Sequence, residues 1–123
     1  MTTLHKRVES FRIPRLKPSL KKKFALIEDI VNQSNYQNHF DCEFRPRYSN
    51  ILKCKVPQLL LKDRNSLKVI EIQLHPKTYD VWVYSFSTNE NGFEDKIIKD
   101  IIVEYDGFDL SFFNEIMKDI INK

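Results

Sequence analysis

Two runs of residues near the middle of the chain constrain the fold most strongly. Residues 67–74 and 79–87 are rich in β-branched and aromatic side chains, and only His75-Pro76-Lys77-Thr78 separate them. A link of this length suits a hairpin and is too short for a helical crossover between parallel strands. The two runs therefore predict neighbouring antiparallel strands. Because both carry apolar residues on each face, we expect central strands that are covered on at least part of each face.

A second hairpin is predicted upstream, where apolar and polar residues alternate over residues 40–48 and again over 52–56. A two-residue loop would place apolar side chains opposite charged ones, so sidedness favours a three-residue loop at 49–51. The expected pairs are Tyr48 with Leu52, Pro46 with Cys54, Phe44 with Val56, Arg47 with Lys53, and Arg45 with Lys55.

Helices are predicted at both ends of this sheet. Apolar residues recur at helical spacing over residues 19–33, with Ser19 in the N-cap position, and Asp109 caps a last helix that runs to about Asn122. Residues 97–105 suit either a strand or a helix, and the Asp106-Gly107 turn favours a strand. We therefore expect an α+β fold with an N-terminal helix, an antiparallel meander of about five strands and a C-terminal helix, in two layers.

The length of 123 residues indicates one domain, which we place at residues 19–123. Residues 1–18 are basic and contain Pro14 and Pro18, so we expect them to form an extended basic arm. No apolar run approaches the roughly 20 residues that cross a bilayer, and the first residues lack the apolar stretch of a secretory signal. We expect an intracellular protein with no membrane partner.

Composition argues against several kinds of chemistry. The chain has only two glycines, which leaves no room for a dinucleotide fingerprint or a Gly-rich phosphate loop. Its two cysteines, Cys42 and Cys54, are wrongly spaced for a paired zinc site, and we expect reduced core thiols. The three histidines lie far apart in sequence. We expect no catalytic residues, no metal and no cofactor, and a binding role rather than an enzymatic one.

One enzymatic alternative remains, because Asp63 and Glu71-Ile72-Gln73, with Glu28 on the preceding helix, partly resemble the metal site of restriction-type nucleases. The match departs from that pattern in having Gln where a Lys is usual, no Pro before the Asp, and a tight hairpin where a helix is needed. Metal-dependent nuclease activity is therefore the remote alternative.

The charge distribution suggests contact with a polyanion. Residues 1–64 carry 14 basic and 6 acidic residues, whereas residues 65–123 carry 6 and 11. On the predicted hairpin, two pairs of cations face each other across strands, which is unfavourable unless an anion such as a phosphate backbone binds there. A solvated edge that prevents sheet-to-sheet aggregation is the alternative explanation. The candidate anion-binding residues are Arg12, Arg15, Lys17, Lys21, Lys22, Lys23, Arg45, Arg47, Lys53 and Lys55.

The last helix suggests a protein partner, because its apolar residues fill about half of its circumference. The extra width either covers the sheet more broadly or binds a partner, for which Phe112, Ile116 and Ile120 are the candidates. Our first hypothesis is a non-enzymatic adaptor or small subunit of a larger assembly, held by a sheet edge or by this helix face. Direct nucleic-acid binding through the arm and the basic hairpin is the second hypothesis, and pairing with another copy of the chain is left open.

Overall fold

The central hairpin of the protein is formed by β5 (Lys68–Leu74) and β6 (Val81–Thr88), as the sequence predicts. The computed structural model describes residues 16–123. The two strands pair antiparallel, with Leu74 opposite Val81 and Ile72 opposite Val83. These four side chains are fully buried, so this face of the hairpin points into the core.

The link between β5 and β6 is held by local hydrogen bonds. His75 Nδ1 accepts the backbone N–H groups of Lys77 and Thr78, each at 3.1 Å. Tyr79 adopts a positive φ of 62°, which a tight link of this kind requires at one position. The turn chemistry therefore fixes how the two central strands meet.

Three further strands extend the hairpin into one antiparallel sheet. The strand order is β1-β4-β5-β6-β7, with β1 at Phe40–Phe44, β4 at Gln58–Asp63 and β7 at Glu94–Val103. The segment that suited a strand or a helix is thus a strand, although it begins and ends earlier than predicted. Two short 3-10 helices, Gln37–His39 and Tyr105–Gly107, flank the sheet in sequence.

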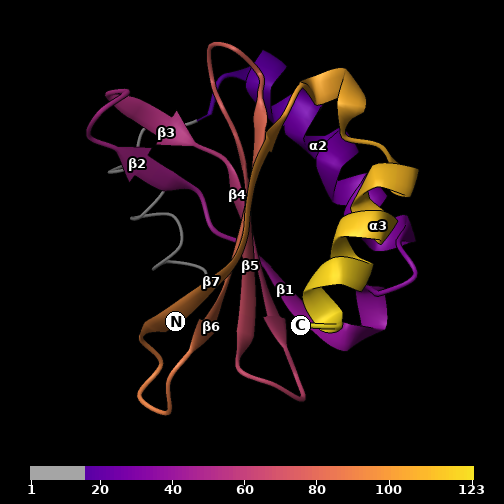
Figure 1. Cartoon of the computed structure of the whole chain (residues 1–123). Helices are drawn as coiled ribbons and strands as arrows, with labels where there is room; N and C mark the ends of the chain where they lie inside the picture. Colours follow the sequence, from indigo (N-terminus) through magenta and orange to yellow (C-terminus); the bar gives the residue numbers. More distant parts are fainter. Residues whose placement is uncertain (1–15) are drawn as a thin grey trace, which may run out of the picture.

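Two helices cover the same face of this sheet (Figure 1). They are α2, Pro18–Gln33, and α3, Leu110–Ile121. Asp109 caps α3 as predicted, since its side chain accepts the N–H of Phe112 at 2.8 Å. The expected Ser19 cap of α2 is wrong: Lys17 is the N-cap residue and makes no side-chain cap hydrogen bond. Pro18 begins the helix because its fixed φ suits the first helical position, where no N–H partner is needed.

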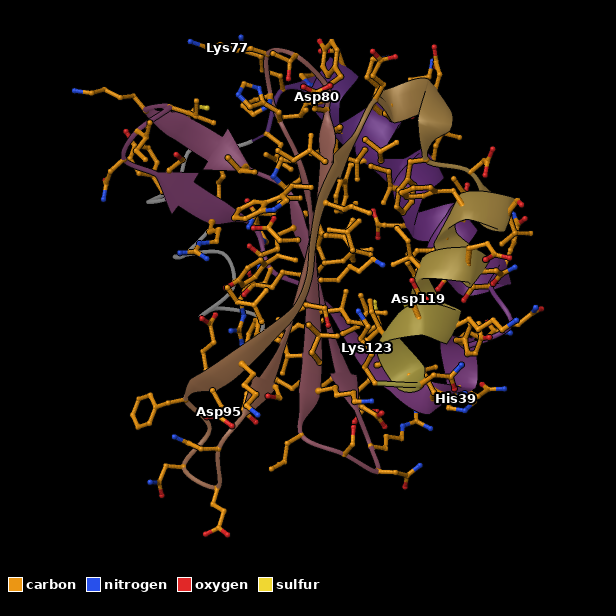
Figure 2. The ribbon with its side chains drawn as sticks, viewed as in Figure 1. His39, Lys77, Asp80, Asp95, Asp119 and Lys123 are labelled. Atoms are coloured by element: carbon orange, nitrogen blue, oxygen red, sulfur yellow. The ribbon has the colours of Figure 1, made fainter. Side chains whose placement is uncertain are left out.

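The predicted α+β class is confirmed, with α2 and α3 on one face of a five-stranded antiparallel sheet and the core between the two layers. Side chains fill the space between the sheet and the helices (Figure 2). From α3, Phe113, Met117 and Ile120 are fully buried there, and the Phe113 ring packs on Phe108 with 5.6 Å between centroids. At the edge of this layer Lys99 Nζ lies 2.7 Å from Asp119 Oδ2, which ties β7 to α3.

The predicted register of the upstream hairpin is wrong, because the strand expected over residues 40–48 is interrupted. It breaks at Arg45-Pro46, and β2 (Arg47–Ser49) pairs with β3 (Cys54–Val56) in a separate two-stranded sheet. The sidedness argument assumed one continuous strand, but Pro46 cannot donate to a ladder and the chain changes direction there. The observed pairs are Arg47 with Val56, Tyr48 with Lys55, and Ser49 with Cys54.

The connecting loop has four residues, 50–53, instead of three. Lys53 takes a positive φ of 53°, and its N–H donates to the carbonyl of Ser49 at 2.8 Å. Consequently the two predicted pairs of cations, Arg47 with Lys53 and Arg45 with Lys55, do not form. The small hairpin leans out from the side of the sheet opposite the helices (Figure 1).

Both cysteines are free thiols, but they are not core residues: Cys42 is exposed and Cys54 partly exposed. Strand β1 is an edge strand whose residues after Phe40 are exposed, which leaves Cys42 outside the core. Within residues 16–123, no helix combines the length and apolar character needed to cross a membrane.

We predict that Phe113→Ala lowers the free energy of unfolding by about 3–5 kcal/mol, because it removes a fully buried ring that packs on Phe108. The matched control is Phe93→Ala, because Phe93 is 71% exposed. This control should change the free energy of unfolding by less than about 0.5 kcal/mol. Urea denaturation measures both. Equal effects of the two substitutions would contradict the assignment of α3 to the core.

Candidate binding groove on the sheet face opposite α2 and α3

A ladder of three aromatic rings lies on the face of β6 that the helices do not cover. Successive residues of a strand point to opposite faces, so Val81 and Val83 enter the core while Trp82, Tyr84 and Phe86 point the other way. Adjacent ring centroids are 5.4 and 5.5 Å apart. All three side chains remain partly exposed. A large aromatic surface on the sheet is thus left available for contact.

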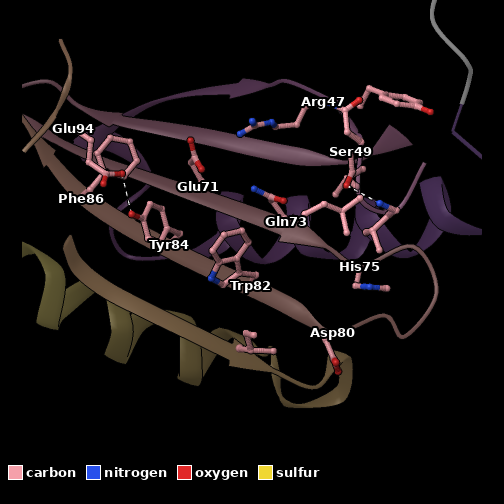
Figure 3. A pocket seen from close by; sticks show the side chains of 16 residues that line it. Arg47, Ser49, Glu71, Gln73, His75, Asp80, Trp82, Tyr84, Phe86 and Glu94 are labelled. Carbon is pink, nitrogen blue, oxygen red and sulfur yellow. Dashed lines mark hydrogen bonds between the residues drawn. The ribbon is translucent and has the colours of Figure 1, made fainter. Parts of the chain in front are cut away.

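The small β2–β3 hairpin supplies the opposite wall and turns this surface into a groove of about 870 Å³ (Figure 3). The sequence places the wall there because Pro46 diverts the chain out of the main sheet before β2 begins. The hairpin side of the groove is lined by Arg47, Tyr48, Ser49, Ile51, Leu52 and Val56. The sheet side is lined by Glu71, Gln73, Trp82, Tyr84, Phe86 and Ile102.

Carboxylates flank the aromatic ladder on both sides. Strand register places Glu71 of β5 and Asp100 of β7 on either side of Tyr84, in one row across the sheet. The Tyr84 hydroxyl donates to Glu94 Oε1 at 2.8 Å, and Trp82 Nε1 donates to Asp100 Oδ1. Figure 3 shows the Tyr84–Glu94 hydrogen bond. Two of the rings therefore hold acidic side chains in place beside them.

The electrostatics of the groove reflect this crowding of negative charge. The hydrogen bond to Glu94 raises the pKa of Tyr84 above its usual value, and partial desolvation and the charges of Glu94, Asp100 and Glu71 add to the effect. Burial raises the pKa of Glu71, which Glu94 raises further and which Arg47 and Arg45 lower. All three carboxylates are close enough to Tyr84 to raise the pKa of its phenol.

One buried acceptor lies on the same face of the sheet. Gln58 is opposite Gln73 across β4 and β5, and cross-strand partners share a face. Gln58 is buried, and its Oε1 has no hydrogen-bond partner among the described residues.

The predicted basic residues do not share one surface in the part of the chain that is described. Arg12 and Arg15 lie outside the described residues. Lys17, Lys21 and Lys22 are exposed at the start of α2, on the helix-covered side. The Lys23 ammonium lies 4.8 Å from the Tyr79 ring centroid and 4.5 Å from that of Tyr105, so it makes cation–π contacts within the protein.

The basic residues of the small hairpin point in different directions. Arg47 lines the groove and is paired with Val56. Lys55 directly precedes Val56 on β3, so its side chain lies on the other face of the hairpin. Arg45 Nη2 lies 3.3 Å from Glu43 Oε2, and Lys53 is in the turn. Their role in anion binding stays a prediction, but a face of four adjacent cations does not form.

The candidate partner residues of α3 are mostly inside the protein. Ile116 and Ile120 are buried in the core, and Phe112 is partly exposed and packs against Phe108 with 5.9 Å between ring centroids. The broad apolar arc of α3 is accounted for by cover of the sheet, the alternative that the sequence left open.

The residues of the nuclease alternative are not brought together. Asp63 accepts hydrogen bonds from the Asn65 N–H and the Ser66 hydroxyl at the β4–β5 turn. Glu71 and Gln73 line the groove, while Glu28 is on α2, on the other side of the sheet. Among residues 16–123 there is no cluster of three or more His, Cys, Asp or Glu side chains that could hold a metal ion.

Sequence reasoning placed apolar residues on both faces of this strand but did not say which face is core, and it did not treat Trp82, Tyr84 and Phe86 as a site. The signal was present: aromatic residues at three alternate positions of one strand indicate a continuous aromatic surface. The sequence did not reveal that both α2 and α3 would pack on the opposite face of the sheet.

We predict that Glu71→Gln raises the free energy of unfolding at pH 7. Burial holds the folded-state pKa of Glu71 above its unfolded value. The contribution of neutral Glu71 to the free energy of unfolding is therefore fully present below the unfolded-state pKa, and it is lost as the pH rises through the folded-state pKa. The free energy of unfolding of Glu71→Gln should not show the part of the decline with rising pH that ionisation of Glu71 causes. Denaturation from pH 4 to pH 7 measures it, with Glu115→Gln on the exposed side of α3 as the control. Parallel profiles for the wild type and Glu71→Gln would contradict the desolvation of Glu71.

Comparison of the chain with protein-family models, with curated proteins and with solved structures finds no match. The case for a function therefore rests on the groove itself.

Proposed function

We propose that the protein is a non-enzymatic binding module that holds a protein partner in the groove between β2–β3 and the sheet face opposite α2 and α3. The observation that carries this proposal is the partly exposed ladder of Trp82, Tyr84 and Phe86. Tyrosine and tryptophan dominate the energetics of protein interfaces, because a large apolar ring is buried while a polar edge keeps a hydrogen bond. Trp82 and Tyr84 already have such bonds, to Asp100 and Glu94.

The neighbouring sheet edge supports a protein as the ligand. Strand β7 pairs with β6 on one side, and among the described residues no strand pairs with its other side. Glu94 and Ile102 of this edge strand also line the groove. An extended segment of a partner can therefore use backbone hydrogen bonds along β7 while its side chains reach the aromatic ladder, as in β-strand addition.

Exposed apolar side chains at the rim favour the same interpretation. Ile51 at the tip of the small hairpin is 91% exposed and Ile102 of β7 is 68% exposed, and both line the groove. Together with the rings they make the groove an apolar surface with a polar margin, which is the usual composition of a protein interface.

Site-specific photo-crosslinking tests the proposal. A photoreactive phenylalanine analogue is placed at Ile102 in the groove or at Leu26 on α2, which is 54% exposed and lies on the helix side of the sheet. In the cells that make the protein, we expect position 102 to give a covalent adduct with a defined protein and position 26 to give none. Ile102→Ser should then lower the affinity for the purified partner about three- to tenfold. Leu26→Ser should leave this affinity unchanged.

Two results would contradict the proposal. Equal adducts from positions 26 and 102, or none from position 102, would show that the groove does not hold a partner. An adduct that nuclease digestion removes would instead favour direct nucleic-acid binding, the second hypothesis from the sequence.

A further inference from the structure

We infer that the groove receives a basic segment of its partner, with an arginine or lysine side chain placed over Tyr84 between the flanking carboxylates. This inference rests on the proposed function and names the chemistry of the ligand. It follows from three features of the groove, namely the arrangement of its acidic groups, its scarcity of cations and its uncovered aromatic faces.

The acidic groups are arranged around one point. Glu71 and Asp100 flank Tyr84 from the two neighbouring strands, and Glu94 accepts its hydroxyl hydrogen bond. Like charges repel one another, and the raising effect of Glu94 on the pKa of Glu71 reflects this repulsion across the aromatic strand β6. A bound guanidinium or ammonium group would remove that repulsion and gain charge-assisted hydrogen bonds.

The protein supplies little positive charge of its own to this point. Among the described residues that line the groove, Arg47 is the only Lys or Arg, whereas Glu71, Asp80 and Glu94 are acidic and Asp100 adjoins them. Arg47 and, more weakly, Arg45 act on Glu71, since each lowers its pKa. The remaining carboxylates keep the groove negative, so it attracts basic ligands and repels carboxylates and phosphates.

The rings add a second kind of attraction for the same ligand. The faces of Trp and Tyr attract cations, and a planar guanidinium can stack on a ring while it forms paired hydrogen bonds with a carboxylate. The protein already uses this chemistry internally, since the Lys23 ammonium lies over both Tyr79 and Tyr105. Tyr84 offers a comparable ring face, here open to the groove and flanked by acidic residues.

The test uses the single tryptophan of the chain, Trp82, as a fluorescent probe inside the groove. Three capped octapeptides are titrated into the full chain, with serine alternating with arginine, with its neutral isostere citrulline, or with glutamate. We expect saturable changes in Trp82 emission with the arginine peptide only. The affinity should fall as salt is raised, because the attraction is largely electrostatic.

Isosteric variants locate the binding site. Glu71→Gln and Asp100→Asn each remove one negative charge beside Tyr84, and should weaken the arginine peptide by about five- to tenfold. Glu115→Gln removes the same charge from exposed α3 and should leave the affinity unchanged. Equal losses in all three variants would overturn the inference, because they would reduce it to attraction by net charge.

Two further outcomes are informative. If position 102 crosslinks to a partner while only the glutamate peptide binds, the inference is overturned and the proposed function stands. If the arginine peptide binds only after Lys6, Arg7, Arg12 and Arg15 are all changed to Gln in the full chain, the occupant is the protein's own N-terminal segment, which overturns a partner as the source of the basic residues.

Discussion

The strict alternation of side chains along β6 is the constraint on which the other features of the structure depend. Val81 and Val83 are fully buried against the helices, and that burial fixes the register and orientation of the strand. Once those residues point inward, Trp82, Tyr84 and Phe86 must point outward. Both α2 and α3 pack on the inner face, and among the described residues only the small hairpin lies over the outer one. The groove is thus a direct consequence of how the core is packed.

Most of the fold could be predicted because its signals are local. The β5–β6 hairpin follows from two strand-forming runs and a short link, and α3 follows from the Asp109 cap and helical spacing. Prediction failed at residues 45–56, where alternation continues through Arg45-Pro46 although the strand does not. Periodicity cannot show a change of direction, because the same pattern fits one long strand or two short ones at an angle.

The candidate site could be predicted only in part, since it depends on which elements become neighbours. The sequence separates basic and acidic halves, and that separation suggested a polyanion. Among the described residues, the basic ones are divided between α2 and the region of the small hairpin, whereas Glu71 of β5 and Glu94 and Asp100 of β7 lie around Tyr84. Sequence distance therefore concealed the acidic group and exaggerated the basic one, because charge clusters are properties of folded surfaces.

The small hairpin joins the main sheet through two short stems, each of which contains a proline. Pro46 lies between β1 and β2, and Pro57, which is fully buried, lies between β3 and β4. Hydrogen bonds hold both stems to the sheet, from the Arg45 N–H to the Gln58 carbonyl at 2.8 Å and from the Leu74 N–H to the Pro57 carbonyl at 3.3 Å. Proline restricts φ at both sites, which limits the rotations by which the hairpin could swing. The groove is thereby preorganised, and the entropy lost on association falls mainly on the incoming chain.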